Sequence, residues 1–517
     1  MKNYIKYMAI LALGVVSCEP ELENSIEDDG FYSNGEADFS NYVALGNSLT
    51  AGYADGALYI TGQQNSYPNI IASKMELAAE GDFDFTQPLV NDNIGGLLLG
   101  GNQIQQPRFV LAGESALTAR PARLNATPTT EVSNKLTGPF NNMGVPGAKS
   151  FHLLAPGYGN VAGVPSGMAN PYFARFASSE GTTIVADAVA QNPTFFTLWI
   201  GNNDVLSFAT SGGDGVYQQN NTDFATYGPN DITDPNAFAF VYNSIVSELA
   251  GEDGSSAEGV LINIPNVTDI PFFNVVPVNP IPLDANTAAA LNAQFGAYNT
   301  QILPGLVQAG ILTEAEANSR KIIFTESNQN FVTLVDEDLT NVTGILQQAP
   351  FNLDPQTAAL LGQLRQATSE DLIPLTSSSF IGTTVNNNPM LVNGVSVPLG
   401  DEHVLTASEQ EIVAQVTTQY NAAIASIAQN YSLGLVDANA LLSQIGASGG
   451  LNYQGIPITS QFVTGGAFSL DGVHLTPRGN AVIANEIIKV INANYEANLP
   501  NVDVGSYGTV SLSNNVQ

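Results

Sequence analysis

A short apolar run that ends in a glycine and a serine constrains the fold of this chain more than any other feature. Residues 42–45 have the composition of a buried strand. Gly46 follows and permits a sharp turn because it has no Cβ, and Ser48 comes two residues later. A strand that turns directly into a helix places this serine at the carboxyl end of a sheet, where open α/β sheets bind ligands. The free N–H groups of such a helix would face any negative charge that develops beside the serine.

Further apolar runs predict the remaining strands of one sheet. Residues 194–200 are apolar almost throughout, as expected for a central parallel strand that is covered on both faces. Thr406, with Glu409 three residues on, gives a capping-box signal for a long helix. Thr476 followed by Pro477 marks the start of another helix. The other expected strands span 260–264 and 433–437, and the other expected helices of this part span 67–79, 183–191 and 237–249.

The charge of the chain excludes one class of partner. The formal net charge is -33 over 517 residues, and such an acidic surface repels phosphate backbones. We therefore expect no nucleic-acid partner. The length alone is compatible with about three domains. Charged residues make up only 12% of the chain while glycine occurs 48 times, which indicates long ordered loops rather than helices held by salt bridges.

The N-terminus has the pattern of a secretory signal. Lys2 and Lys6 precede an apolar stretch, residues 7–16, that is too short to span a membrane. Cys18, the one cysteine in the chain, follows a small residue in a sequence that resembles a bacterial lipobox. This resemblance implies a signal peptide over 1–17, lipidation of Cys18 and attachment to the outer membrane on its periplasmic or cell-surface side. An ordinary signal peptide with an incidental cysteine is the alternative.

The residues after Cys18 predict a tether. Residues 18–40 are acidic and polar with little periodicity, as is typical of a flexible segment. An acidic stretch at this place also resembles the surface-export signal of lipoproteins from Bacteroidetes.

Four short motifs follow the order that they have in the SGNH, or GDSL, serine hydrolases. Gly46-Asn47-Ser48-Leu49 resembles the first block of that family, with Asn47 where the family usually has aspartate. The resemblance implies a flavodoxin-like three-layer α/β/α sandwich with a parallel sheet and an activity on esters. The other blocks are Asn142-x-x-x-x-Gly147, then Gly201-x-Asn203-Asp204 after the strand at 194–200, and Asp471-x-x-His474 before the helix that starts at Pro477.

This resemblance also implies a role for each motif residue. Ser48 would be the nucleophile, with His474 as its general base and Asp471 orienting the imidazole. The backbone N–H groups of Ser48 and Gly147 and the side-chain amide of Asn203 would form the oxyanion hole. Asp204 is expected to brace the loop rather than to take part in chemistry.

Other candidate residues fit less well. Of the remaining histidines, His152 follows the Gly147 turn and is a candidate for lining the pocket, while His403 has no assigned role. Gly446-Ala447-Ser448-Gly449-Gly450 matches the nucleophile-elbow pattern Gly-x-Ser-x-Gly. That motif requires a strand before the serine, whereas a helix is predicted there, so we reject Ser448 as a nucleophile.

The spacing between the motifs predicts a hydrolase domain over 41–497 with two insertions. The first, at about 81–138, is rich in glycine, asparagine and proline and is expected to form loops. The second, at about 265–400, is expected to contain helices at 287–302 and 355–366. It begins with a proline-interrupted apolar stretch, 270–283, which is either an exposed acyl platform or lid beside the site or a segment packed under the insertion. Residues 498–517 are polar and read as a loose tail.

We therefore expect an extracytoplasmic serine esterase or lipase that cleaves acyl esters without a cofactor. No metal is implied, since three scattered histidines and one cysteine leave few ligands for a transition metal. A carbohydrate O-acetylesterase is an alternative. Another is a non-catalytic lipid- or glycan-binding lipoprotein that assists an outer-membrane transporter. The expected partners are an acyl lipid or acylated glycan and the membrane through Cys18, with an outer-membrane protein as a further candidate.

Overall fold

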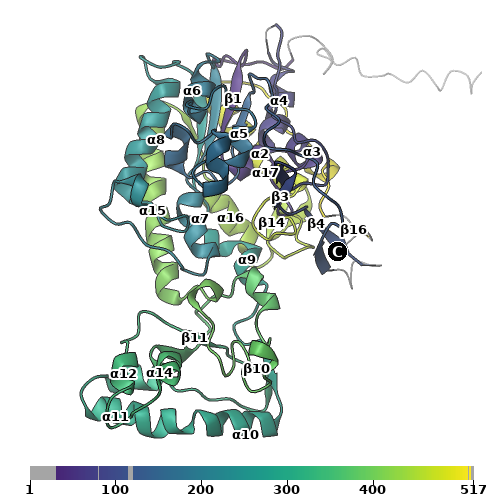
Figure 1. Cartoon of the computed structure of the whole chain (residues 1–517). Coiled ribbons are helices and arrows are strands. Elements are labelled where there is room, and N and C mark those ends of the chain that lie inside the picture. Colours follow the sequence, from purple (N-terminus) through teal and green to yellow (C-terminus); the bar gives the residue numbers. More distant parts are fainter. Residues whose placement is uncertain (1–30, 80, 114–119, 511, 514–517) are drawn as a thin grey trace, which may run out of the picture.

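The computed structural model describes residues 31–79, 81–113, 120–510 and 512–513 (Figure 1). The predicted signal peptide, Cys18 and the first part of the predicted tether lie outside the described residues. Within the described residues, no helix has both the length and the apolar character needed to cross a membrane.

A five-stranded parallel sheet forms the centre of the molecule, as the strand pattern predicts. Its order is β13-β8-β7-β1-β6, and every neighbouring pair is parallel. β7 lies in the middle and is buried along its whole length, which confirms the expectation of a central strand. The strands are β1 (Tyr42–Gly46), β6 (Asn142–Gly144), β7 (Phe195–Trp199), β8 (Glu258–Ile262) and β13 (Gly434–Val436).

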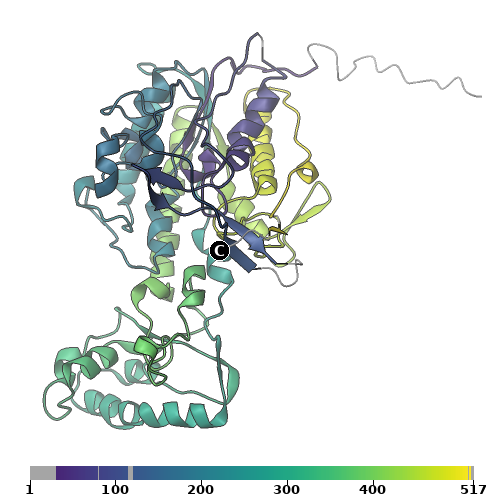
Figure 2. The same cartoon turned by 45° about the vertical axis from the view of Figure 1, so that its right-hand side comes forward.

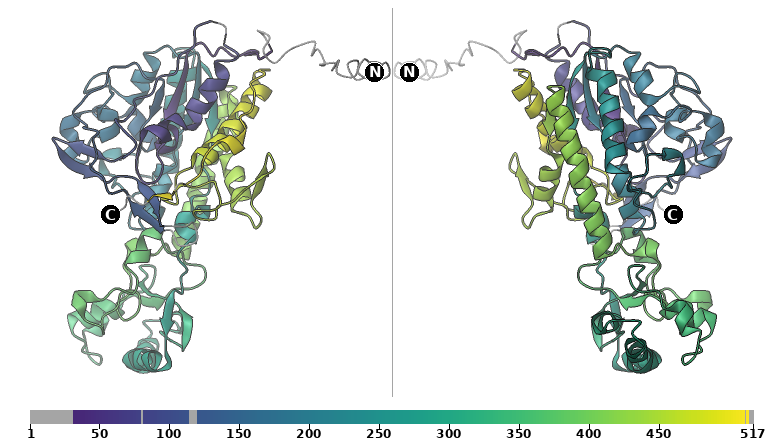
Figure 3. Two further views of the ribbon diagram at one scale, coloured as in Figure 1. Left: turned by 90° about the vertical axis from the view of Figure 1, so that its right-hand side faces the viewer. Right: turned by 90° about the vertical axis from the view of Figure 1, so that its left-hand side faces the viewer.

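Helices cover both faces of this sheet (Figures 1 and 3). On one face, α4 (Tyr67–Met75) packs against α17 (Pro477–Asn494). On the other face, α15 (Ala407–Asn430) packs against α8 (Pro235–Ala250), and the short helix α6 (Ile184–Val189) lies beside α8. The predicted α/β class with a parallel sheet is therefore confirmed, and its arrangement is that of a three-layer sandwich. We call this sandwich the main body.

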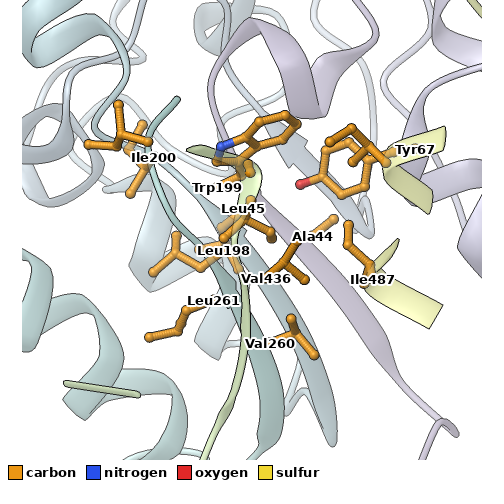
Figure 4. Close-up of a cluster of buried hydrophobic side chains, with 14 of the residues drawn as sticks. Ala44, Leu45, Tyr67, Leu198, Trp199, Ile200, Val260, Leu261, Val436 and Ile487 are labelled. Carbon is orange, nitrogen blue, oxygen red and sulfur yellow. The ribbon is translucent and has the colours of Figure 1, made fainter. Parts of the chain in front are cut away.

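The core of the main body lies between the sheet and these helices (Figure 4). Tyr42 is fully buried, and its hydroxyl lies 2.8 Å from the Thr197 hydroxyl of the neighbouring strand, so its polar atom has a partner. Figure 4 shows buried side chains from four strands packed with one residue each of α4 and α17: Ala44, Leu45, Leu198, Val260, Leu261, Val436, Tyr67 and Ile487.

Both predicted helix starts are confirmed. Thr406 and Glu409 form a capping box at the N-terminus of α15, in which the side chain of each residue accepts a hydrogen bond from the backbone N–H of the other. The Thr476 hydroxyl accepts from the Gly479 N–H at 3.1 Å, and Pro477 is the first residue of α17.

A second hydrophobic cluster lies below the main body, within residues 275–404, which we call the lower lobe (Figures 1 and 2). Helical residues cover most of the expected helix at 287–302, since the helix over Ala285–Gln294 is followed by a π-helical turn over Tyr298–Ile302. The expected helix at 355–366 ends at Leu361, because residues 364–366 pair with a neighbouring strand. The lobe contains α10 (Ala285–Gln294), α11 (Leu303–Gln308), α12 (Glu314–Ser319), α13 (Thr343–Leu346), α14 (Pro355–Leu361), and the antiparallel pairs β9 (Ile281–Leu283) with β10 (Ser327–Asn330) and β11 (Thr333–Val335) with β12 (Leu364–Gln366).

The segment at 81–138 contains short strands where we expected loops. Gly100 and Gly101, both with positive φ, make the two-residue turn of a hairpin. These strands are too short to give an alternating pattern that the sequence analysis could detect. They are β2 (Leu97–Leu99) with β3 (Asn102–Gln105), and β4 (Phe109–Ala112) with β5 (Arg120–Arg123).

Two segments that were expected to be flexible pack against the main body instead. In the predicted tether, Phe39 is buried and stacks edge-on against Phe195 at 5.1 Å. In the predicted loose tail, Val502 and Val504 are buried, and β16 (Leu512–Ser513) joins β4 as a parallel strand. Sparse apolar residues sufficed because each fills a gap in an existing core, which composition alone does not reveal.

Candidate active site

Ser48 lies at the carboxyl end of β1, as the first residue of the short helix α2 (Ser48–Ala51). The Asn47 side chain caps this helix by accepting from the Leu49 N–H at 3.0 Å. A Cβ on Gly46 would lie 2.5 Å from the Trp199 carbonyl oxygen, so only glycine lets β1 and β7 close at this point. Gly46 therefore acts through close packing rather than through an unusual backbone angle.

The three residues expected to form a triad lie in hydrogen-bond contact. The Nε2 atom of His474 is 2.8 Å from Ser48 Oγ, although the two residues are 426 positions apart in the chain. The Nδ1 atom of the same ring is 2.8 Å from Asp471 Oδ2. His474 lies in the turn that leads into α17, so the helix N-terminus fixes its position. The geometry is that of a nucleophile, a base and a residue that orients the base.

Asp471 is surrounded by hydrogen-bond donors. Its Oδ1 accepts from the backbone N–H groups of Val473 and His474, both at 2.9 Å, and from the Ser469 hydroxyl at 3.1 Å. Its Oδ2 accepts from the Gly56 N–H at 2.8 Å as well as facing the imidazole. Burial alone would raise the pKa of Asp471, but the imidazole and these hydrogen bonds outweigh burial and hold that pKa well below its usual value. The carboxylate is therefore ionised at any pH near neutrality.

The loop after α2 supports Asp471, and the sequence analysis missed it. The Asp55 N–H donates to Ser469 Oγ at 2.9 Å, and Asp55 Oδ1 accepts from the Leu470 N–H at 2.9 Å. These bonds place Gly56, which has a φ of +72°, against the carboxylate of Asp471. The Asp55-Gly56 pair is a turn signal that the sequence does contain, but its contact with residues 414 positions away could not be read from it.

The three predicted oxyanion donors follow the carboxyl ends of β1, β6 and β7, which lie at one edge of the sheet. The Ser48 N–H is the first of α2 and has no partner within that helix. Gly147 is exposed, has a φ of +82°, and a Cβ there would meet no atom closer than 3.9 Å. Asn203 is the first residue of α7 (Asn203–Thr210) and lines one cavity together with Ser48 and His474. Its Nδ2 also donates to the Ala148 carbonyl at 2.9 Å, which joins it to the Gly147 loop.

Asp204 braces this loop, as its place in the sequence suggested. Its two carboxylate oxygens accept from the backbone N–H and the hydroxyl of Ser150, both at 2.7 Å. Burial raises the pKa of Asp204 even though these bonds and Lys149 act to lower it. The bonds tie the start of α7 to the segment that carries Gly147.

The cavity at Ser48 adjoins a second cavity that is apolar. The first, of about 40 Å³, is lined by Ser48, His474 and Asn203. The second, of about 60 Å³, lies between α17 and α16 (Ala438–Gly446). The residues that line both are Leu49, Pro265, Ile270, Leu442 and Val473.

The proline-interrupted stretch 270–283 is packed rather than exposed as a platform. Ile270, Phe272 and Phe273 are buried in the core of the main body, and Ile281 is buried in the lower lobe. Neither alternative holds for the whole segment, because its start packs in the main body rather than under the insertion and only Ile281 packs in the lower lobe, while Val275 is exposed. Ile270 nevertheless contributes to the site because it lines both cavities.

The other candidate residues lie apart from this site. His152 stacks on Tyr158 with ring centres 4.4 Å apart, and burial together with Lys149 lowers its pKa to about 3, so this ring is neutral. It does not line the cavity at Ser48. His403 stacks on Phe380 in the lower lobe. Ser448 is exposed and follows α16, so the strand that a nucleophile elbow requires is not before it.

Comparisons with protein-family models, with curated proteins and with solved structures found no match. The roles of the site residues therefore depend on geometry and on the chemistry of the side chains.

Proposed function

We propose that this chain is a serine ester hydrolase of the SGNH type. The observation that carries the proposal is the continuous series of contacts from Asp471 through His474 to Ser48, each of 2.8 Å. Asn203 and Gly147 lie at the same edge of the sheet, where they complete the set of groups that acyl transfer needs. Four motifs of one family in their usual order support the same assignment.

In the proposed reaction, Ser48 Oγ attacks the ester carbonyl carbon while its proton moves to His474 Nε2. Asp471 stabilises the imidazolium that forms. The N–H groups of Ser48 and Gly147 and the Asn203 amide hold the oxyanion. His474 then gives the proton to the departing alcohol, which leaves an acyl group on Ser48. Water, deprotonated by His474, attacks this acyl group and releases the acid.

The two cavities favour esters of longer acyl chains over acetyl esters. The second cavity is lined almost wholly by aliphatic and aromatic side chains and adjoins the nucleophile, so it suits the tail of an acyl chain. An acetyl group would fill only the first. A glycan O-acetylesterase is therefore the less favoured alternative.

We further propose that Cys18 is lipidated and anchors the enzyme to the outer membrane, on the periplasmic or cell-surface side, where an outer-membrane protein is a candidate partner. The support is the lipobox-like sequence, in which the one cysteine of the chain occupies the position that lipidation requires.

A fluorophosphonate probe tests the proposed function. We expect the folded chain without residues 1–18 to become labelled, and labelling to be lost in Ser48→Ala. Ser448→Ala is the matched control, because this serine has the elbow-like sequence but an exposed position after a helix. Absence of labelling in the unaltered chain, or its persistence in Ser48→Ala, would contradict the proposal and favour a lipid- or glycan-binding protein.

Leu442→Trp tests the acyl cavity. The indole would fill the space between Leu442 and α17, so kcat/KM for nitrophenyl octanoate should fall about 10-fold or more relative to nitrophenyl acetate. Overpacking costs about 1–3 kcal/mol of stability. The ratio of the two esters is measured on the same preparation, so partial unfolding does not affect it. An unchanged ratio would mean that the acyl chain binds elsewhere.

A further inference from the structure

Three carboxylates meet where the lower lobe joins the main body. Glu337 follows β11, Asp401 begins the turn before α15, and Glu409 lies in the first turn of α15. One oxygen atom from each of them lies within 4.8 Å of the others. The sequence does not reveal this cluster, because 72 positions separate its first and last members (409 − 337).

Glu409 has a buried oxygen without a partner. Its Oε2 accepts from the N–H and the hydroxyl of Thr406, at 2.7 and 2.8 Å. Glu409 is only 6% exposed, and its Oε1 is buried and makes no hydrogen bond with any described residue. A buried carboxylate oxygen is normally satisfied, so this atom is available to a ligand that the described residues do not supply.

Among the described residues, no cationic side chain forms an ion pair with the cluster. The salt bridges of the described residues include none with Glu337, Asp401 or Glu409. Arg365 is engaged elsewhere, by Asp336 and Asp371.

Two carboxyl groups of the cluster have raised pKa values, as expected where no positive charge lies nearby. Burial, followed by the nearby carboxylates, raises the pKa of Asp401 to about 7. Burial, followed by the charges of Asp401 and Glu337, raises the pKa of Glu409 to about 8, although its bonds from Thr406 act to lower it.

We propose that Glu337, Asp401 and Glu409 bind a hard divalent cation, with Ca²⁺ as the best fit. Carboxylate oxygens are the ligands that Ca²⁺ prefers, and the cluster contains no histidine or cysteine that would favour a softer metal. Three oxygens spread evenly at about 2.4 Å around one Ca²⁺ are at most about 4.2 Å apart, so oxygens that all lie within 4.8 Å of one another need at most a small movement to share one coordination sphere. Mg²⁺, with bonds of about 2.1 Å, would require them to move closer.

A cation bound at the cluster would lie where several parts of the fold meet. The turn Gly212-Gly213 follows α7 and packs against both Asp401 and Glu409. A Cβ on Gly212 would lie 2.2 Å from the Asp401 carbonyl oxygen, and one on Gly213 would lie 1.8 Å from Glu409 Oε1. α7 begins at Asn203, the proposed oxyanion donor. A bound cation would thus join the lower lobe, α15 and the far end of α7, whether or not the protein is an esterase.

Calorimetric titration of the chelator-treated chain without residues 1–18 with CaCl₂ tests this inference. We expect saturable binding of about one Ca²⁺ per chain, and weaker binding of MgCl₂. Glu337→Gln should weaken Ca²⁺ binding about 10-fold or more, because affinity depends on the number of charged ligands. Glu337 is exposed, so this variant is expected to fold. Glu326→Gln, which removes one exposed charge from the same lobe, should bind as the unaltered chain does.

Thermal unfolding provides an independent measurement. Saturating Ca²⁺ should raise the midpoint of the unaltered chain by about 2–4 °C over the value in chelator, and this rise should vanish in Asp401→Asn. Absence of saturable binding would overturn the inference, and so would binding that both Glu337→Gln and Asp401→Asn retain unchanged. In either case the three carboxylates would share protons instead. The fluorophosphonate test is unaffected by these outcomes, so the two proposals can fail separately.

Discussion

Replacing Asp471 with asparagine is expected to lower kcat about 10⁴-fold, as the loss of the orienting carboxylate does in a serine protease triad. The reason lies in the five donors that surround this side chain. An amide has one oxygen and one NH₂ group, so asparagine must turn its NH₂ toward some of these donors. Which side the NH₂ takes decides the state of His474.

The hydrogen-bond donors around residue 471 decide which side the NH₂ group takes. At the Oδ1 position the NH₂ would face two fixed backbone N–H groups, those of Val473 and His474. At the Oδ2 position it would face one fixed N–H, that of Gly56, and the imidazole, which can change its tautomer. The second arrangement meets less repulsion. It leaves Nδ1 as an acceptor and moves the ring proton to Nε2, so His474 can no longer accept the proton of Ser48.

Three measurements would check this prediction. The rate of ester hydrolysis at neutral pH should fall, KM should change little, and circular dichroism should show an unchanged fold. Asp253→Asn, at an exposed turn, is the charge-matched control and should keep full activity. A fall of less than about 10-fold in Asp471→Asn would contradict the assigned role of the carboxylate.

The depressed pKa of Asp471 also makes the stability of the fold depend on pH. Because the folded-state pKa is depressed, its contribution to stability is fully present above the ordinary aspartate value of about 4. It is lost as the pH falls through the lower folded value. The acid unfolding curve of Asp471→Asn should therefore lack this component.

The sequence was sufficient to predict the parts of the fold whose causes are local. Apolar runs specified all the strands of the central sheet except the short edge strand β6. Thr406 and Thr476 specified two helix starts because a cap acts within three residues. The first three motifs lie together in space because each follows a strand and parallel strands end at one edge of a sheet, whereas the start of α17 places Asp471 and His474 there.

Contacts between distant segments could not be predicted in the same way. The support of Asp471 by Asp55 and Gly56 depends on how two loops meet, and neither loop has a periodic pattern. The cluster of Glu337, Asp401 and Glu409 depends on the packing of the lower lobe against α15. The cluster contains no histidine or cysteine, so the scarcity of those residues in the sequence does not exclude it.

Asn203→Ala is expected to lower kcat about 10²–10³-fold, or about 2.7–4 kcal/mol of barrier, because it removes one oxyanion donor. The effect should appear in kcat rather than in KM, since the donor acts on charge that develops only in the transition state. A boronic acid that mimics the tetrahedral intermediate should bind the variant more weakly by a similar factor, whereas affinity for an unreactive substrate analogue should be kept.

Asn203 also holds the Ala148 carbonyl, so a structural role must be separated from the oxyanion role. Ser150→Ala provides this separation, because it removes a hydroxyl that donates to Asp204 in the same loop but lies outside the cavity at Ser48. It leaves a buried carboxylate oxygen with one fewer donor, which costs about 1–3 kcal/mol of stability. We expect Ser150→Ala to lower the unfolding midpoint with little change in kcat. Asn203→Ala should instead lower kcat with little change in the unfolding midpoint. Equal losses of kcat in both variants would mean that Asn203 acts by holding the loop in place rather than by donating to the oxyanion.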